Sequence, residues 1–167
     1  MPFVFTNTFF MLLGLGFLLL SMAWVGREFL LVAIVYDVAL FGSALVDYFL
    51  TEREDRVEVE RHTDERMSLG ADNAVSIQVT NRARRPLRVR ARDEYPDRMR
   101  LIGEREATMA IRSGATAKFE YALHPATRGS YPFGDVLGRV RGPLGLVWRQ
   151  IRWPLAREVR VYPNIRE

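Results

Sequence analysis

The sequence predicts an N-terminal transmembrane helical hairpin followed by an all-β, antiparallel immunoglobulin-like sandwich. Three observations predict this class. The first fifty residues hold two long apolar runs, and nearly all the charged residues follow Thr51. From Arg56 onward, apolar and polar residues alternate in short runs, which is typical of half-buried strands. We therefore expect a transmembrane helical hairpin over 1–50 and a β-sandwich domain over 51–167.

The first apolar run, from Phe3 to Val25, contains no charged residue. A helix needs about 20 apolar residues to cross the hydrocarbon core of a bilayer. A secretory signal begins with basic residues and has a shorter apolar core, whereas no lysine or arginine precedes this run. The segment is therefore predicted to be a membrane span rather than a signal peptide.

The second apolar run, Phe29–Leu50, is interrupted only by Asp37 and Asp47. The connection Gly26–Glu28 is so short that the two helices must be antiparallel neighbours. Lysine and arginine are more frequent in cytoplasmic than in external loops, and this connection has only Arg27. The segment after the second run is richer in arginine, which predicts that both ends of the hairpin are cytoplasmic. Its arginines are Arg53, Arg56, Arg61 and Arg66.

Asp37 is an ionisable residue inside the second span. Such a residue costs at least about 2.5 kcal/mol at a helix centre on insertion scales, and it usually faces another helix or a cavity. One hypothesis is a proton or ion site. The other is a helix-packing or oligomer contact beside small residues such as Gly14 and Gly16. We favour packing because a two-helix hairpin has no room for a transport path.

Five runs of the charged part alternate with a period of two, as half-buried strands do. Glycine-, proline- and asparagine-rich turns separate them. Short antiparallel strands with one wet face, in a segment of this length, predict an immunoglobulin-like sandwich. The predicted inward residues are Val57 and Val59; Val75, Ile77 and Val79; Leu87, Val89 and Ala91; Phe119, Tyr121 and Leu123; and Val159 and Val161.

The segment 128–153 predicts a long C-terminal β-hairpin. A glycine-rich phosphate loop is excluded, because no helix follows the glycines and no Gly-Lys-Ser/Thr occurs. Positive φ is expected at Gly129 and Gly134, which flank aromatic residues at turns. On the last strand of the hairpin, we expect the face of Leu146 and Trp148 to be buried in the sandwich core.

Several function classes find no support in the sequence. The chain has no cysteine and two histidines, and these histidines are not in a metal-ligand spacing. No nucleophile motif occurs, so we expect neither an enzyme nor a cofactor. Arg88, Arg90 and Arg92 alternate along one strand face, but no base-stacking aromatic residues lie between them. We predict that this basic face is solvated and does not bind nucleic acid.

The stretch "ATRGSYPFGDVLGRVRGPLGLVWRQ", followed by "VRVYPNI", resembles a bacterial membrane-anchored family catalogued as domain of unknown function 58. Its members begin with two membrane helices and a β-sandwich. They then continue into a von Willebrand factor A-like domain, so the resemblance covers the N-terminal half of a typical member. The matching residues are Arg128–Gly129, Tyr131, Phe133–Gly134, Pro143–Leu146 and Val161–Pro163.

The resemblance implies a non-enzymatic interaction or scaffold protein of the bacterial cytoplasmic membrane. It would act with a MoxR-type ATPase of the AAA+ class in assembling or activating other complexes. The alternative is a membrane sensor whose sandwich binds a small ligand, a peptide or an anionic lipid. The candidate interaction or structural residues are Asp37, Arg128, Gly129, Tyr131, Phe133, Gly134, Pro143, Gly145 and Trp148.

Overall fold

The computed structural model describes residues 3–163, and the chain forms two compact units. The first unit runs to Glu52 and also includes the segment Val140–Gln150. The second unit contains Arg53–Arg139 and resumes at Ile151. The whole of 128–153 was predicted to belong to the sandwich, whereas the segment Val140–Gln150 belongs to the unit that contains the helices.

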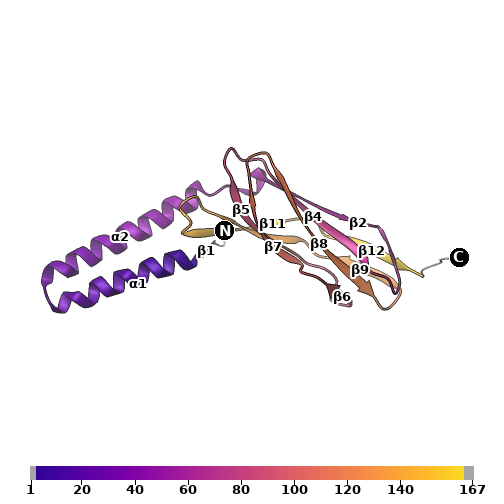
Figure 1. The fold of residues 1–167 in the computed structure, drawn as a ribbon, viewed down its shortest axis with the longest axis horizontal. Coiled ribbons are helices and arrows are strands. Elements are labelled where there is room, and N and C mark those ends of the chain that lie inside the picture. Colours follow the sequence, from indigo (N-terminus) through magenta and orange to yellow (C-terminus); the bar gives the residue numbers. More distant parts are fainter. Residues whose placement is uncertain (1–2, 164–167) are drawn as a thin grey trace. The chain divides into compact units, whose positions relative to one another are not determined.

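The first unit is built from two helices and a short strand (Figure 1). Strand β1 (Phe3–Phe5) precedes helix α1 (Asn7–Ser21), a 3-10 turn η1 (Met22–Trp24) and helix α2 (Arg27–Leu50). The first apolar run was expected to be helical from Phe3. It is not, because β1 pairs antiparallel with β11 (Val147–Trp153).

Helix α1 begins where a side chain can cap it. The hydroxyl of Thr6 accepts the amide hydrogen of Phe9 at 3.2 Å, which satisfies one of the free amides of the first turn. The two helices lie side by side in opposite directions (Figure 1). The Tyr36 hydroxyl on α2 donates to the Leu12 carbonyl on α1 at 2.9 Å.

Both helical segments are long and apolar enough to be candidate membrane spans. In the span Asn7–Trp24, 11% of the residues are buried, and in Arg27–Leu50, 17% are buried. A core helix of a soluble protein is mostly buried, so these helices are exposed to an unusual degree for apolar segments. The most exposed of their apolar side chains are Met11, Phe17, Leu18, Trp24, Leu31, Val38 and Phe49.

The second unit is a β-sandwich. Strands β2 (Val57–Thr63), β4 (Asn73–Asn81), β8 (Thr116–Pro125) and β6 (Met99–Ile102) form one antiparallel sheet in that order. Strand β5 (Leu87–Asp93) lies between β10 (Val136–Arg141) and β7 (Glu106–Ile111) in another. The third sheet has the order β3 (Arg66–Ser68), β12 (Arg157–Tyr162), β9 (Gly129–Phe133). A 3-10 turn η2 (Glu54–Arg56) precedes β2.

The predicted fold class is confirmed. Two long apolar helices precede a sandwich in which the pairs β2–β4, β4–β8, β6–β8, β5–β7 and β9–β12 are antiparallel and the pair β12–β3 is parallel. The inward residues predicted on β2, β4, β5 and β12 are all buried, and on β8 only Phe119 is half-buried. A period of two therefore identified the core faces correctly.

Within 128–153, the strands predicted at 136–142 and 146–153 are confirmed as β10 and β11, which are neighbours in their sheet, but the segment before Val136 does not belong to this hairpin. The backbone of β9 pairs with β12, with Tyr131 opposite Val159, and not with β10. The true β-hairpin is formed by β10 and β11. The chain passes from the second unit into the first along β10 and returns along β11.

The predicted core face of β11 is also wrong. Leu146 is buried, but in a cluster with Phe9 and Leu40 of the helices and not in the sandwich core. Within β11, Val147, Arg149, Ile151 and Trp153 are buried, whereas Trp148 is half-buried. In the second unit, Trp153 packs against Gly138, where a β-carbon would collide with the indole ring. Its indole nitrogen donates to the Val57 carbonyl at 2.9 Å. Trp153 is therefore the tryptophan that closes the sandwich core.

Candidate functional site

The carboxylate of Asp47 on α2 binds the loop that joins β10 to β11. One oxygen accepts the Leu144 amide at 2.6 Å, and the other accepts the amides of Leu146 and Val147 at 2.8 and 3.0 Å. Asp47 is 0% exposed. A buried carboxylate is costly unless it is fully hydrogen-bonded, and these three donors meet that requirement.

The sequence Gly142-Pro-Leu-Gly-Leu gives this loop its shape. Gly145 has φ +74°, which side chains with a β-carbon rarely adopt, and its amide donates to the Gly142 carbonyl at 3.0 Å. A β-carbon on Gly142 would collide with the Asp47 carboxylate. Pro143 is exposed at the loop tip. The two glycines therefore let three backbone donors of one loop converge on one side chain.

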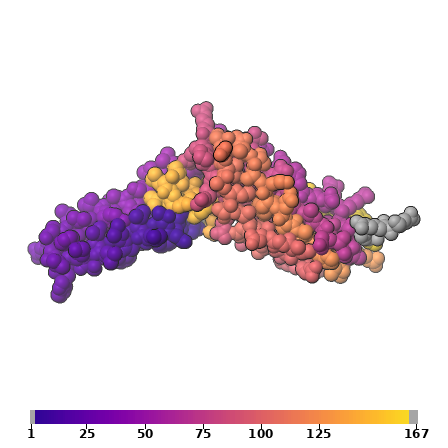
Figure 2. Space-filling view, viewed as in Figure 1, coloured from indigo at the N-terminus to yellow at the C-terminus, as the bar shows by residue number. Residues whose placement is uncertain are grey.

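The β10–β11 hairpin in turn forms hydrogen bonds with residues at the ends of both helices. The Arg149 side chain donates to the Tyr48 carbonyl at 2.6 Å, near the C-terminus of α2, and lies over the Tyr48 ring at 4.5 Å. Cations near a helix C-terminus are favourable. The Thr6 hydroxyl donates to the Gly145 carbonyl at 2.7 Å. Figure 2 shows the loop, in yellow-orange, against the ends of both helices.

We call this arrangement the helix–hairpin junction. It consists of Asp47, Tyr48, Arg149, Thr6 and the loop 142–147. The Asp47 side chain on α2 accepts hydrogen bonds from the loop's amides, and the Arg149 side chain on β11 donates one to the Tyr48 carbonyl of α2. Each partner thus satisfies the backbone groups that the other leaves free.

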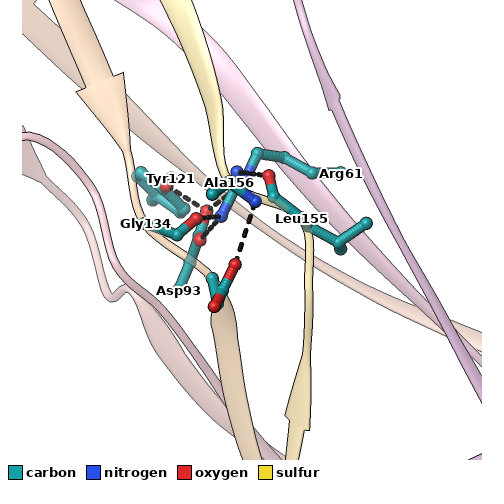
Figure 3. A network of polar contacts seen from close by, with 7 residues as sticks. Arg61, Asp93, Tyr121, Gly134, Leu155 and Ala156 are labelled. Atoms are coloured by element: carbon teal, nitrogen blue, oxygen red, sulfur yellow. Dashed lines mark hydrogen bonds and ion pairs between the residues drawn. The ribbon is translucent and has the colours of Figure 1, made fainter.

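A second buried polar cluster lies inside the sandwich (Figure 3). The guanidinium of Arg61 on β2 forms an ion pair with both oxygens of Asp93 on β5. It also donates to the carbonyls of Leu155 at 2.7 Å and Gly134 at 2.8 Å. The Tyr121 hydroxyl on β8 donates to Asp93 at 2.5 Å. We call this cluster the sandwich network.

The sandwich network perturbs the ionisation of Tyr121. Burial, followed by the neighbouring Asp93 charge, raises the pKa of the Tyr121 phenol far above its ordinary value. The phenol therefore stays protonated and remains a donor to Asp93. Beneath the ion pair, the Phe133 ring lies 4.8 Å from the Arg61 guanidinium carbon, in the range of a cation–π contact.

A smaller cluster lies nearby in the second unit. The Asp135 carboxylate accepts from the Arg152 side chain and from the Ala156 amide, the latter at 3.0 Å. The hydrogen bond from Arg152 holds the pKa of Asp135 below its ordinary value. This cluster fixes the two ends of the segment between β11 and β12.

The candidate residues of the segment 128–134 belong to the second unit. Arg128 is exposed. Gly129 has φ +153°, as expected. Tyr131 is buried, and its hydroxyl donates to the Thr127 carbonyl at 2.9 Å. Phe133 lies beneath the sandwich network, and Gly134 supplies it with a carbonyl. Gly134 does not have positive φ; a β-carbon there would lie 2.7 Å from the Glu94 β-carbon.

The remaining candidates belong to the first unit. Pro143 and Gly145 form the loop of the junction, and the backbone of Trp148 pairs with Val4 of β1. Asp37 contacts Gly16 of α1, where a β-carbon would collide with its carboxylate. One carboxylate oxygen of Asp37 is buried without a hydrogen-bond partner in the described chain. The contact is of the close helix-packing kind that small residues permit.

Three central residues were not among the candidates: Asp47, Arg61 and Asp93. Two of them had a signal in the sequence. Arg61 continues the inward positions of Val57 and Val59, and Asp93 continues those of β5. Opposite charges at inward positions of two strands indicate a buried ion pair. Asp47 had no comparable signal.

The basic face of β5 is arranged as predicted, with Arg88, Arg90 and Arg92 exposed. Arg90 forms an ion pair with Glu106 of β7. An open groove of about 730 Å³ lies beside these strands. It is lined by Arg90, Arg92, Leu101, Gly103, Glu104, Arg105, Glu106, Ala107 and Thr108.

No family model matches the chain, and no curated protein matches it. Among solved structures, it is similar to the CARDB domain of a Pyrococcus furiosus protein crystallised in complex with di-metal ions. That match has 12% identity and a TM-score of 0.43, and covers 64% of this chain and 87% of the other.

Two further solved structures are similar over 64% of this chain. The first is an Escherichia coli alpha-2-macroglobulin fragment, at 15% identity and a TM-score of 0.48, of which 16% is covered. The second is a FixG-related protein from Vibrio parahaemolyticus, at 9% identity and a TM-score of 0.42, of which 97% is covered. These similarities concern the fold alone.

Proposed function

We propose that the chain is a non-enzymatic scaffold or interaction protein, anchored by its helical hairpin in the bacterial cytoplasmic membrane. The observation that carries this proposal is the exposure of the helices. Of the residues in the two apolar spans, 11% and 17% are buried. Exposed apolar surface of this extent needs a membrane or a partner to cover it.

The helix–hairpin junction supports an anchoring role. Within the first unit, Asp47 and Arg149 bind the β10–β11 loop to the end of α2. The chain leaves or enters this unit after Glu52, after Arg139 and after Gln150. A sandwich attached through a β-hairpin as well as through the end of α2 is connected to its anchor by more than a single linker.

The proposed partner is an AAA+ ATPase of the MoxR type, which the chain would help to assemble or activate other complexes. The resemblance of the Arg128–Gly134 and Pro143–Leu146 motifs supports this choice. Affinity purification of the tagged full chain from native membranes tests it. We expect an AAA+ ATPase to be enriched over a tagged, unrelated two-helix membrane protein. Recovery of the tagged chain without an AAA+ ATPase would contradict this choice of partner.

The proposed orientation places both ends of the hairpin in the cytoplasm. The arginines that follow α2, against the single Arg27 between the helices, support it. Cysteine labelling tests it directly, because the chain has no cysteine of its own. In intact cells, we expect an impermeant reagent to label Arg27→Cys and to spare Arg53→Cys until the membrane is permeabilised. The reverse pattern would contradict the orientation.

A ligand-sensing role is the second candidate, and the arginine-lined groove beside β5 and β7 favours it. The same purification separates the two roles. A sensor is expected to yield no ATPase, and its thermal stability should rise with anionic lipid or with a small anionic ligand.

A further inference from the structure

Strand β7 lies at the end of its sheet order, with β5 on one side and no strand on the other in the described chain. The Asp93 amide donates to the Arg105 carbonyl at 2.9 Å. Antiparallel pairs alternate between hydrogen-bonded and non-hydrogen-bonded pairs. Asp93 and Arg105 are therefore a hydrogen-bonded pair. Along the register from this pair, Glu106, Thr108 and Ala110 occupy the non-hydrogen-bonded positions, so their backbone N–H and C=O groups point away from β5.

Beyond Glu106 at its start, this free edge lacks the usual protection. Edge strands are commonly blunted by charged side chains, prolines or bulges. From Ala107 to Ile111, β7 has none of these residues, and its register with β5 is continuous. The side chains of Thr108 and Ala110 are exposed. The edge can therefore accept another strand without rearrangement.

The surroundings of the edge favour an acidic strand. The groove beside it contains Arg90, Arg92 and Arg105 together with Glu104 and Glu106. Arg90 pairs with Glu106, and Arg92 lies 3.8 Å from Glu94, outside the groove lining. Arg88 is exposed, and its side chain has no ion pair among residues 3–163. It lies opposite Ala110. Because alanine is small, the Arg88 guanidinium can reach past it to a carboxylate on an added strand.

We propose that the outer edge of β7 is a docking site for an extended acidic segment of a partner protein, which adds to the sheet as a further strand. Backbone hydrogen bonds to Thr108 and Ala110 would supply affinity, and Arg88 with the groove arginines would select acidic side chains. Strand addition of this kind is a recurring mode of peptide recognition.

This inference rests on the proposed interaction role but not on the identity of the ATPase. The two fail separately. An ATPase recovered from membranes together with absent peptide binding would remove the docking site and leave the function. Peptide binding without ATPase recovery would do the opposite.

The test measures peptide binding to the full chain in detergent by fluorescence anisotropy. The probe is a labelled peptide of about eight residues, the length of an ordinary strand, in which glutamate and threonine alternate. The matched peptides carry lysine in place of glutamate, or N-methyl groups on alternate amides. We expect the acidic peptide to bind at least about tenfold more tightly than either control, since the lysine peptide loses the charge complementarity and the N-methylated peptide loses the edge hydrogen bonds.

Two variants locate the site. Thr108→Pro removes an outward N–H that β5 does not use, so the sheet should remain intact while peptide affinity falls about tenfold or more. Thr108→Val, which keeps the N–H, is the control and should bind like the parent. Arg88→Glu should weaken the acidic peptide and strengthen the lysine peptide.

Equal binding of the acidic and lysine peptides, or unchanged binding by Thr108→Pro, would overturn the proposal, as would the absence of peptide binding. Should Thr108→Pro fail to fold, the N-methylated peptide tests the same hydrogen bonds from the ligand side. Equal affinity of the methylated and unmethylated acidic peptides then overturns strand addition.

Discussion

Asp93 in the sandwich and Asp47 at the end of α2 are both 0% exposed, but different groups satisfy them. Asp93 meets a cation and a phenol, Arg61 and Tyr121, within the sandwich network. Asp47 meets only backbone amides of the loop 142–147. The counter-cation of the junction, Arg149, donates instead to a helix carbonyl.

The difference separates two uses of a buried carboxylate. In the sandwich, opposite charges on β2 and β5, together with the neutral phenol on β8, join strands through side chains, so their geometry depends on strand register. At the junction, Asp47 recognises the conformation of a loop, because three amides must converge on it. The sandwich network therefore stabilises a core, while Asp47 selects one shape of the β10–β11 loop.

The largest effect is expected in the sandwich core. Trp153→Ala should lower the free energy of unfolding by about 3–5 kcal/mol, as for other buried aromatic residues. Trp148→Ala should cost less than half of that, because Trp148 is half-buried in the first unit. Denaturant unfolding of the full chain in detergent, followed by far-UV circular dichroism, measures both. Equal losses would mean that the two faces of β11 contribute alike.

Removal of Asp93 tests the sandwich network. Asp93→Ala leaves the buried Arg61 cation without its counter-charge, which typically costs about 3–5 kcal/mol. Replacing both residues, as Arg61→Met with Asp93→Leu, should recover a large part of this loss, since paired apolar substitutions are often neutral. The same unfolding measurement applies. A double variant no more stable than Asp93→Ala would show that the remaining carbonyls need Arg61.

Neutralising Asp47 should have a smaller and more local effect. Asp47→Asn keeps the shape but exchanges one acceptor oxygen for a donor group, and we expect a loss of about 1–3 kcal/mol for the hydrogen bonds affected. Asp37→Asn makes the same change on the same helix and is the matched control. It should have little effect, because one Asp37 oxygen has no partner among the described residues. Protease sensitivity of the loop 142–147 reports the difference.

Tyr121 gives the smallest effect and a dependence on pH. The folded state raises the pKa of the Tyr121 phenol above its ordinary value of 10.0. Its stabilising contribution is therefore complete below about pH 10 and is lost as the pH rises further. Tyr121→Phe should cost about 1 kcal/mol at neutral pH. The loss of stability above pH 10 should be shallower in the variant than in the parent, as measured by unfolding at a series of pH values.

The parts of the molecule with a local periodicity were predictable. The two apolar runs and the alternating strands follow from residue types a few positions apart, and Arg61 and Asp93 fall on inward positions of their strands. The buried face of β11 was not predictable, because it contains Arg149. That guanidinium is buried only because the Tyr48 carbonyl and ring, far away in the sequence, receive it. Asp47 was missed for the same reason, since its donors lie in a distant loop.

Amide hydrogen exchange of the full chain in detergent tests most directly whether Asp47 holds the β10–β11 loop independently of the sandwich. In Asp47→Asn, we predict faster exchange at Leu144, Leu146 and Val147, with unchanged protection of β4 and β8. In Asp93→Ala, we predict unchanged exchange at these three loop amides and a loss of protection in β4 and β8. Unchanged exchange of the three loop amides in Asp47→Asn, or a loss of protection throughout β4 and β8 in that variant, would contradict this account.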